Sequence, residues 1–157
     1  MDMKRVQLSD NLWLDEYIPK SLYVRPYTKG NVWYKREDAF FAVLVRKLNP
    51  RLILADQMLR EKFGPVTLND WWDDGRFNER GLRVCGTSTG AELSDHFQGN
   101  ASDKVFKNAT AEEVRDYIKL NWKVLGITII EADTDWVHSS VAWVKDQKSL
   151  VIVPIPK

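Results

Sequence analysis

Three side chains of the kind that hold a divalent metal stand out in this sequence of 157 residues. Six residues separate His96 from Asp103, and His138 lies farther along; the chain has only two histidines, and both belong to this set. Gly99 permits a sharp turn, through which a histidine at the end of a loop and a carboxylate on the next strand can converge. Two imidazoles and one carboxylate leave zinc a fourth position for water, as in catalytic rather than structural sites.

A candidate catalytic base stands three residues before the second histidine of this set. With a ligand at the start of a strand and Asp135 on the preceding turn, both can face one cavity. A carboxylate in that position can move a proton from water to a leaving amine while the metal polarises the carbonyl. Asp133 and Glu131 are alternatives, but Asp133 stands at an odd offset and Glu131 is expected on a strand. We therefore expect Asp135 to be the base.

Two short segments carry a resemblance to a known family. Residues 90–103 read Gly-Ala-Glu-Leu-Ser-Asp-His-Phe-Gln-Gly-Asn-Ala-Ser-Asp. This resembles the pattern Gly-Ala-x-x-Ser-x-His-x-x-Gly-x-Ala-x-Asp of the D-alanyl-D-alanine carboxypeptidase family of zinc peptidases, which includes vancomycin-resistance dipeptidases and many phage endolysins. Residues 135–138, Asp-Trp-Val-His, are similar to the family's second motif, acidic-x-x-His. The resemblance implies that both histidines and Asp103 bind Zn²⁺ and that Asp135 is catalytic.

An arginine upstream of the first motif extends the resemblance. Arg83 ends a Gly-Leu-Arg tripeptide thirteen residues before His96, similar to the family's Gly-aromatic-Arg, whose arginine is expected to orient substrate and stabilise the oxyanion. Leucine replaces the aromatic residue, and Arg80 is an alternative for this role. Ser140 stands where many members have an acidic residue that supports the ligands, so its presence would loosen their orientation. These departures leave room for a divergent or inactive member.

The resemblance also implies a substrate and a setting. The family members encoded by phages cut peptidoglycan stem peptides, either at the L-Ala–D-Glu bond or at a bond involving D-Ala. No signal peptide is legible, so the protein is expected to be made in the host cytoplasm. It would reach the cell wall after holin-dependent release or as part of a virion. The alternative is a non-catalytic phage structural or binding module on the same fold, with residues 1–36 as the surface for virion assembly partners.

Composition excludes several other classes of function. Lys and Arg number 23 against 22 Asp and Glu, and the basic residues are scattered, which argues against nucleic acid as a partner. No stretch approaches the roughly 20 apolar residues of a membrane span, so membrane insertion is not expected. The single cysteine, Cys85, rules out an intramolecular disulfide and a thiolate-rich zinc site. No third histidine is present to activate it, which argues against a cysteine peptidase.

The pattern of elements predicts one α+β domain over residues 1–157. Apolar residues at three- and four-residue steps predict two helices within 37–63, divided at Asn49-Pro50. A capping box at Thr110 predicts a helix to about Trp122. Segments rich in β-branched and aromatic residues predict strands. These strands are expected over 66–68, 101–107, 126–131, 137–143 and 150–153, with Trp71-Trp72 continuing the first of them.

The expected architecture places the chemistry on the strands. Residues 1–36 are expected to form an irregular aromatic-rich arm, and residues 64–143 the catalytic core. The resemblance implies a small antiparallel sheet with flanking helices, like the hedgehog/DD-peptidase fold. Three tryptophans flank the proposed site and would form either the walls of a substrate groove or part of the core, of which core packing is the stronger expectation. They are Trp71, Trp72 and Trp136.

Overall fold

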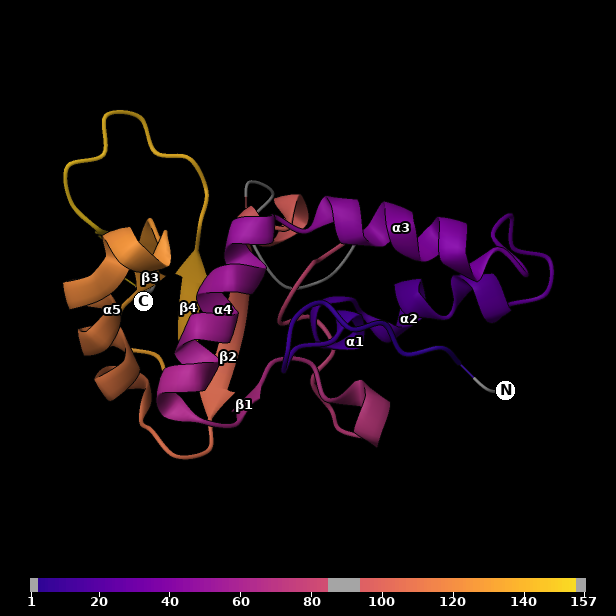
Figure 1. The fold of residues 1–157 in the computed structure, drawn as a ribbon, viewed down its shortest axis with the longest axis horizontal. Coiled ribbons are helices and arrows are strands. Elements are labelled where there is room, and N and C mark those ends of the chain that lie inside the picture. Colours follow the sequence, from indigo (N-terminus) through magenta and orange to yellow (C-terminus); the bar gives the residue numbers. More distant parts are fainter. Residues whose placement is uncertain (1–2, 85–93, 155–157) are drawn as a thin grey trace.

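A five-stranded sheet lies beside a region of short helices, and the fold is α+β (Figure 1). The computed structural model describes residues 3–84 and 94–154. The helices are α1 (Leu14–Tyr17), α2 (Lys20–Tyr23), α3 (Glu37–Lys47), α4 (Pro50–Phe63) and α5 (Ala111–Leu125), with 3-10 helices η1 (Arg25–Tyr27), η2 (Trp71–Asp73) and η3 (Asp95–Gln98). The strands are β1 (Val66–Thr67), β2 (Ala101–Phe106), β3 (Ile129–Glu131), β4 (Val137–Ser140) and β5 (Val151–Val153). None of the described helices is long and apolar enough to cross a membrane.

The sheet is mixed, so the expectation of an antiparallel sheet needs correction. Its strand order is β1-β2-β4-β3-β5, and β5 pairs with β3 in parallel whereas the other pairings are antiparallel. The reason lies in the loop 141–150. Thr128, just before β3, donates to the carbonyl of Ser140 at the end of β4 and accepts from the amide of Val151 at the start of β5. The loop 141–150 therefore begins and ends at the same end of the sheet. Because β3 also starts at that end, β5 runs parallel to β3.

Local signals predicted α3, α4 and α5 correctly. The helical run is divided as expected, since α4 begins at Pro50 and the Asn49 side chain caps it by accepting from the amide of Arg51 at 3.0 Å. Thr110 and Glu113 form the predicted capping box. The helix α5 continues three residues past Trp122 and ends where Gly126 adopts a left-handed conformation, with φ of 69°.

The predicted strand at Trp71-Trp72 is wrong, because a turn centred on Asp70 occupies this position. The Asp70 carboxylate accepts from the amide of Phe77 at 2.6 Å, and its carbonyl accepts from the amide of Gly75 at 2.9 Å. The turn leaves the two tryptophans in η2. An aspartate that bonds to nearby backbone amides competes with strand pairing, so tertiary and local contacts override the aromatic propensity for strands.

The aromatic residues of the N-terminal region belong to the hydrophobic core. Tyr17 and Tyr23 are fully buried, and Tyr27 is nearly so. Trp71 packs edge-on against Tyr23, with ring centroids 5.3 Å apart, and its indole N–H donates to the carbonyl of Ile18 at 2.9 Å. Because these contacts join the first 27 residues to the segment just before the candidate site, the N-terminal region helps to position it.

The helices α4 and α5 cover one face of the sheet, where a buried ion pair ties α4 to β2 (Figure 1). Lys104 is inaccessible to solvent, and its Nζ lies 2.9 Å from Oδ1 of Asp56 on α4. The other carboxylate oxygen accepts from Tyr17 at 2.9 Å and from Ser102 at 2.7 Å, while Nζ donates to Ser139 at 2.6 Å. The ion pair therefore links α1, α4, β2 and β4, and each charge has the additional hydrogen bonds that a buried pair requires.

Removing one partner of this buried pair will destabilise the fold strongly. Lys104→Ala leaves the Asp56 carboxylate buried without its counter-charge, which costs about 3–5 kcal/mol of unfolding free energy. Urea unfolding followed by circular dichroism measures this loss. The control is Lys107→Ala, since Lys107 is exposed just after the same strand, and its replacement should change the unfolding free energy by no more than about 0.5 kcal/mol. Equal effects of the two substitutions would contradict the structural role of the ion pair.

Candidate metal centre

Two of the three predicted metal ligands lie opposite one another on adjacent strands. In the antiparallel pairing of β2 with β4, Asp103 is the direct partner of His138. Side chains alternate between the faces of a sheet. Because Ser102 and Lys104 point toward α4, Asp103 and His138 point to the opposite face. The buried ion pair and the candidate ligands therefore lie back to back on the same two strands.

The third ligand, His96, is presented by the short helix η3. The Ser94 side chain caps this helix by accepting from the amide of His96 at 3.4 Å. Gly99 follows with φ of 70°, and a Cβ atom there would lie 1.9 Å from the carbonyl oxygen of Lys47. Its own carbonyl accepts from the amide of Asn49 at 2.9 Å. The turn at Gly99 lies so close to the α3–α4 junction that it requires glycine. This contact fixes the point at which the chain leaves η3 and turns toward β2.

The ligand atoms converge at distances suited to a metal. His96 Nε2 lies 3.3 Å from His138 Nδ1 and 3.3 Å from Asp103 Oδ1, and His138 Nδ1 lies 2.7 Å from Asp103 Oδ1. Donors of a tetrahedral zinc site with bonds of roughly 2.0–2.1 Å lie about 3.3 Å apart, so two of the three distances match and the third is shorter. All three residues are buried. This group could hold a metal ion, and no fourth side chain of the described residues belongs to it.

A backbone carbonyl orients the first histidine for this role. His96 Nδ1 lies 2.7 Å from the carbonyl oxygen of Gly81. Since a carbonyl only accepts, Nδ1 donates to it, and Nε2 faces the other two residues of the cluster. Gly81 is held in turn by α1, because the amide of Leu82 donates to the carbonyl of Tyr17 at 2.7 Å. A Cβ at Gly81 would lie 2.4 Å from that same oxygen, so α1 contacts the backbone that orients the ligand.

The carboxylate of the cluster is held in its ionised form. Burial alone would raise the pKa of Asp103, but its hydrogen bonds to His138 and His96 outweigh burial and hold the pKa well below its usual range. A carboxylate must be deprotonated to bind a metal. The second oxygen, Oδ2, accepts from the guanidinium of Arg83 at 3.0 Å. This leaves Oδ1 directed at the two histidines.

The structure distinguishes the two candidate arginines. Arg83 contacts a metal-ligand candidate directly through Asp103, and its Nε donates to the carbonyl of Glu79 at 3.0 Å. Arg80 instead stacks on Phe77, with its guanidinium carbon 3.4 Å from the ring centroid. Burial lowers the pKa of Arg80, and the charge of Asp103 acts in the opposite direction. Arg83 is therefore the arginine that belongs to the cluster, and the geometry gives it the task of orienting the carboxylate.

Ser140, the residue that departs from the family pattern, forms a different support. Its hydroxyl donates to the carboxylate of Asp95 at 2.7 Å and accepts from the amide of Ala142 at 3.0 Å. Asp95 immediately precedes His96 at the start of η3. The hydrogen bond between Ser140 and Asp95 therefore joins β4 to η3, the helix that carries His96. In this support the carboxylate comes from η3 and the hydroxyl from the strand.

The predicted base lies in the bend before β4, outside the ligand cluster. Asp135 is exposed, and among the described residues its carboxylate has no hydrogen-bond or ion-pair partner. Asp133 is exposed in the same bend with a positive φ of 58°, and Glu131 ends β3. The structure thus brings together the three ligands and Arg83, whereas Asp135 stands at the surface three residues before His138.

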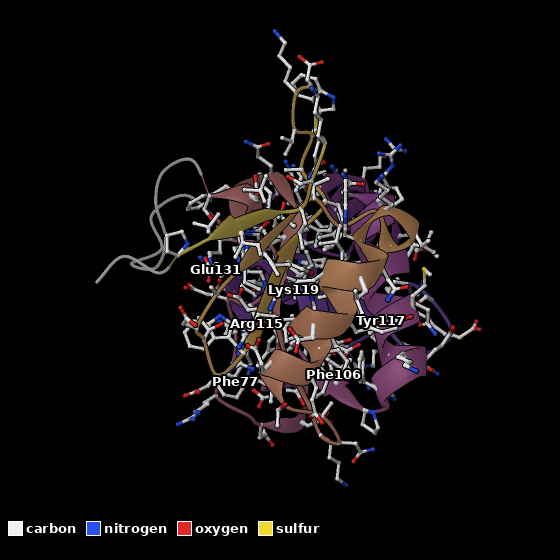
Figure 2. The ribbon with its side chains drawn as sticks, turned by 90° about the vertical axis from the view of Figure 1, so that its left-hand side faces the viewer. Phe77, Phe106, Arg115, Tyr117, Lys119 and Glu131 are labelled. Carbon is white, nitrogen blue, oxygen red and sulfur yellow. The ribbon has the colours of Figure 1, made fainter. Side chains whose placement is uncertain are left out.

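Arg115, which the sequence analysis did not identify, holds the bend that carries Asp135 (Figure 2). This arginine on α5 is buried, and its Nη1 donates to the carbonyls of Thr134 and Trp136 at 2.9 and 3.2 Å. Glu112 pairs with its other side at 2.9 Å. Both neighbours of Asp135 are therefore fixed to the helix. The only sequence signal was an arginine on the apolar side of α5, and a helical arginine is ordinarily exposed.

The remaining predicted features divide between core, surface and undescribed chain. Trp71 is buried in the core and Trp72 packs against it, whereas Trp136 is 38% exposed in the bend beside Asp135. Only Trp136 is placed to contact a ligand at the bend. Residues 90–93 of the first motif and Cys85 lie outside the described residues.

The chain should bind one divalent metal ion, and the binding should need all three residues of the cluster. His96→Ala removes a donor from a buried site, so we expect the content of zinc per chain to fall from one to below about 0.1 after dialysis against metal-free buffer. Asp146→Asn is the control, because Asp146 is exposed and asparagine tolerates its positive φ of 51°. Elemental analysis of both purified proteins checks this, and equal zinc contents would rule out the site.

Comparison of the chain with family models, with curated proteins and with solved structures gives no significant match. The geometry of the centre therefore carries the functional conclusion.

Proposed function

We propose that this protein is a zinc-dependent peptidase, with His96, Asp103 and His138 as the metal ligands. The observation that carries the proposal is the convergence of two imidazole nitrogens and one carboxylate oxygen within 2.7–3.3 Å of one another. Three protein donors with no fourth among the described side chains match the donor set of catalytic rather than structural zinc sites. Imidazole nitrogen favours zinc over magnesium or calcium.

The residues around the ligands have the chemistry that peptide hydrolysis needs. Bound zinc would supply an acidic water molecule and polarise the carbonyl of the bond to be cut. Asp135 would accept the proton of the attacking water and deliver it to the leaving amine. Its exposure leaves the carboxylate accessible to a substrate that lies across the bend. Arg83 would stabilise the negative charge on the carbonyl oxygen while it orients Asp103.

The proposed substrate is a bacterial peptidoglycan stem peptide, cut at the L-Ala–D-Glu bond or at a bond involving D-Ala. This rests on the resemblance of residues 90–103 and 135–138 to the D-alanyl-D-alanine carboxypeptidase family and its hedgehog/DD-peptidase fold. The α+β class and the helices on one face of the sheet support this resemblance, whereas the parallel pairing of β5 with β3 departs from the antiparallel sheet that it implies. In this proposal the protein is phage-encoded, is made in the host cytoplasm and acts on the cell wall, as a released endolysin or within a virion.

The alternative, a non-catalytic phage module, has less support than the peptidase. It rested on an aromatic-rich arm available for assembly, but Tyr17, Tyr23 and Tyr27 of this region are buried in the core. This alternative also gives no account of why two histidines and a carboxylate converge in one buried cluster. These observations favour the peptidase.

Replacing the proposed base should abolish hydrolysis and leave the metal in place. Asp135→Asn removes the proton acceptor, so we expect the release of stem-peptide fragments from purified sacculi to fall by about 10²–10⁴-fold at unchanged zinc content. Asp133→Asn is the matched control in the same bend, since asparagine tolerates its positive φ of 58°. Mass spectrometry of the released muropeptides measures the rate and identifies the bond. Activity that survives Asp135→Asn, or falls equally in the control, would contradict this assignment.

Loosening the bend should lower the turnover rate without loss of metal. Arg115→Lys keeps the positive charge but cannot bridge the carbonyls of Thr134 and Trp136 as the guanidinium does. We expect kcat to fall about tenfold with zinc content unchanged, because the position of Asp135 becomes less defined. Lys119→Gln on the exposed side of the same helix is the control and should retain kcat. A kcat of Arg115→Lys equal to that of the wild type would show that the bend needs no such support.

A further inference from the structure

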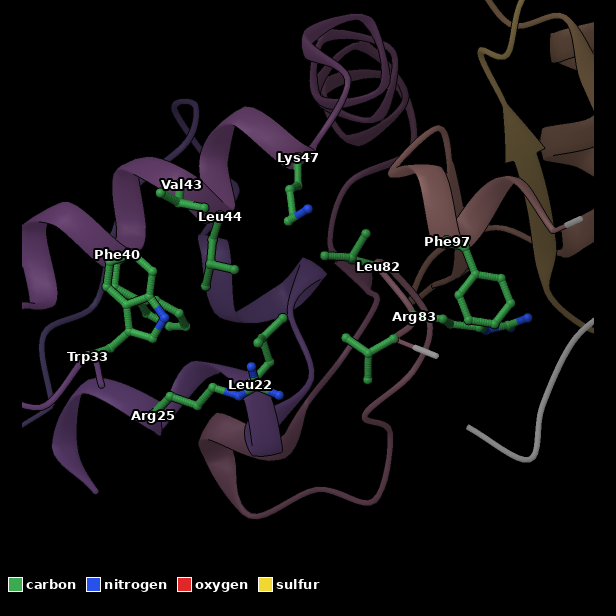
Figure 3. A pocket seen from close by; sticks show the side chains of 11 residues that line it. Leu22, Arg25, Trp33, Phe40, Val43, Leu44, Lys47, Leu82, Arg83 and Phe97 are labelled. Atoms are coloured by element: carbon green, nitrogen blue, oxygen red, sulfur yellow. The ribbon is translucent and has the colours of Figure 1, made fainter. Parts of the chain in front are cut away.

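A pocket of about 390 Å³ opens beside the candidate metal centre, between the N-terminal helices and η3 (Figure 3). It shares Arg83 with the centre, and Phe97, the residue after His96, forms one of its walls. The opposite walls come from α2, η1 and α3. A ligand that extends from the metal centre past Arg83 would therefore enter this pocket.

The lining of the pocket combines an apolar floor with positive charge. Its principal apolar side chains come from five segments of the chain: Leu22, Trp33, Phe40, Leu44, Leu82 and Phe97. Lys47 reaches into the space from the end of α3, with Leu44 and Leu82 on either side, and Arg25 lies across from it (Figure 3). None of the described residues that line the pocket is acidic. The pocket therefore suits a ligand with apolar parts and a negative charge.

The side chains of Lys47 and Arg25 are available to a ligand. Neither Lys47 nor Arg25 has an ion pair or a side-chain hydrogen bond with any described residue, and both are exposed. The guanidinium of Arg83, in contrast, is directed out of the pocket to Asp103 (Figure 3). Arg83 thus serves the metal centre, and Lys47 and Arg25 serve the pocket. Their aliphatic stems extend the apolar walls, and their charged ends remain accessible to a ligand.

We infer that this pocket binds a carboxylate-bearing residue of the peptide substrate, with Lys47 and Arg25 as the residues that determine specificity for it. The inference rests on the proposed peptidase function and names the class of its substrate, namely short peptides with a free carboxylate near the cleaved bond. Stem peptides carry two such groups, the α-carboxylate of D-Glu and the C-terminal carboxylate. Charge-assisted hydrogen bonds from Lys47 or Arg25 would hold one of them while the apolar floor contacts the neighbouring methyl or methylene groups.

A binding experiment tests this without relying on turnover. The zinc-loaded Asp135→Asn chain is titrated calorimetrically with the stem pentapeptide L-Ala-γ-D-Glu-L-Lys-D-Ala-D-Ala and with two analogues, each amidated at one of its two carboxylates. We expect one amidation to weaken binding by about tenfold or more, which identifies the carboxylate. Adding Arg25→Gln and Lys47→Gln should weaken binding of the parent peptide by a similar factor. It should also abolish the difference between the parent peptide and that analogue.

The matched control is Arg46→Gln in the same Asp135→Asn background. Arg46 precedes Lys47 on α3 but faces a different part of the surface, so its replacement should leave the preference for the acidic peptide intact. Equal binding of all three peptides, or an equal effect of Arg46→Gln and the double substitution, would overturn the inference. Hydrolysis by the chain with Asp135 intact is measured separately. If the chain hydrolyses the peptide but binds the acidic and amidated peptides equally, the inference about the pocket is refuted and the peptidase proposal stands. If it prefers the acidic peptide but does not hydrolyse it, the peptidase proposal is refuted and the inference about the pocket stands.

Discussion

The pairing of β2 with β4 is the interaction on which the rest of the structure depends. Its register sets Asp103 opposite His138 and, one residue away on the other face, Ser102 opposite Ser139. A shift of one residue would turn the candidate ligands toward α4 and the buried Lys104 toward the candidate centre, because side chains alternate in a strand. The hydrogen bonds of Lys104 and Ser102 to groups on α4 and β4 oppose such a shift. The buried ion pair on one face of the sheet thus helps to fix the positions of the candidate ligands on the other face.

The candidate centre is assembled by contacts that come from the beginning of the chain as well as from the sheet. Tyr17 binds the backbone at Leu82, Gly81 orients His96, and the α3–α4 junction accommodates Gly99. These contacts join protein groups to one another, so they help to hold the three donors close together. The N-terminal region therefore contributes to the site itself and to the pocket beside it.

The two sides of the centre differ in how firmly they are held. The candidate ligands are buried, Arg83 is partly buried, and several hydrogen bonds connect them, whereas Asp135 lies exposed in a bend fixed through its neighbours by Arg115. A metal ligand needs a fixed position, while a proton-transferring carboxylate needs access to both water and substrate. On the other side of the ligands, the pocket with Lys47 and Arg25 offers positive charge.

Part of this protein was determined by local sequence alone. The capping box at Thr110, the proline at Pro50 and the apolar periodicity placed the helices, since these signals act over a few residues of chain. The candidate ligand set came from the resemblance of two short segments, 90–103 and 135–138, to a family pattern. The turn at Asp70 was missed, because its side-chain hydrogen bond to the amide of Phe77 outweighed the strand propensity of two tryptophans.

Only the tertiary structure decided which residues support the chemistry. The buried pair of Lys104 with Asp56 joins groups 48 positions apart, and Arg115 contacts a bend 19 positions away. The direction of β5 likewise depends on where the loop 141–150 re-enters the sheet. No periodicity or motif encodes such contacts, because they arise when separate elements pack together and each buried polar group must find a partner. The sequence determined the donors, and the packing of the chain decided their distances, their supports and the pocket beside them.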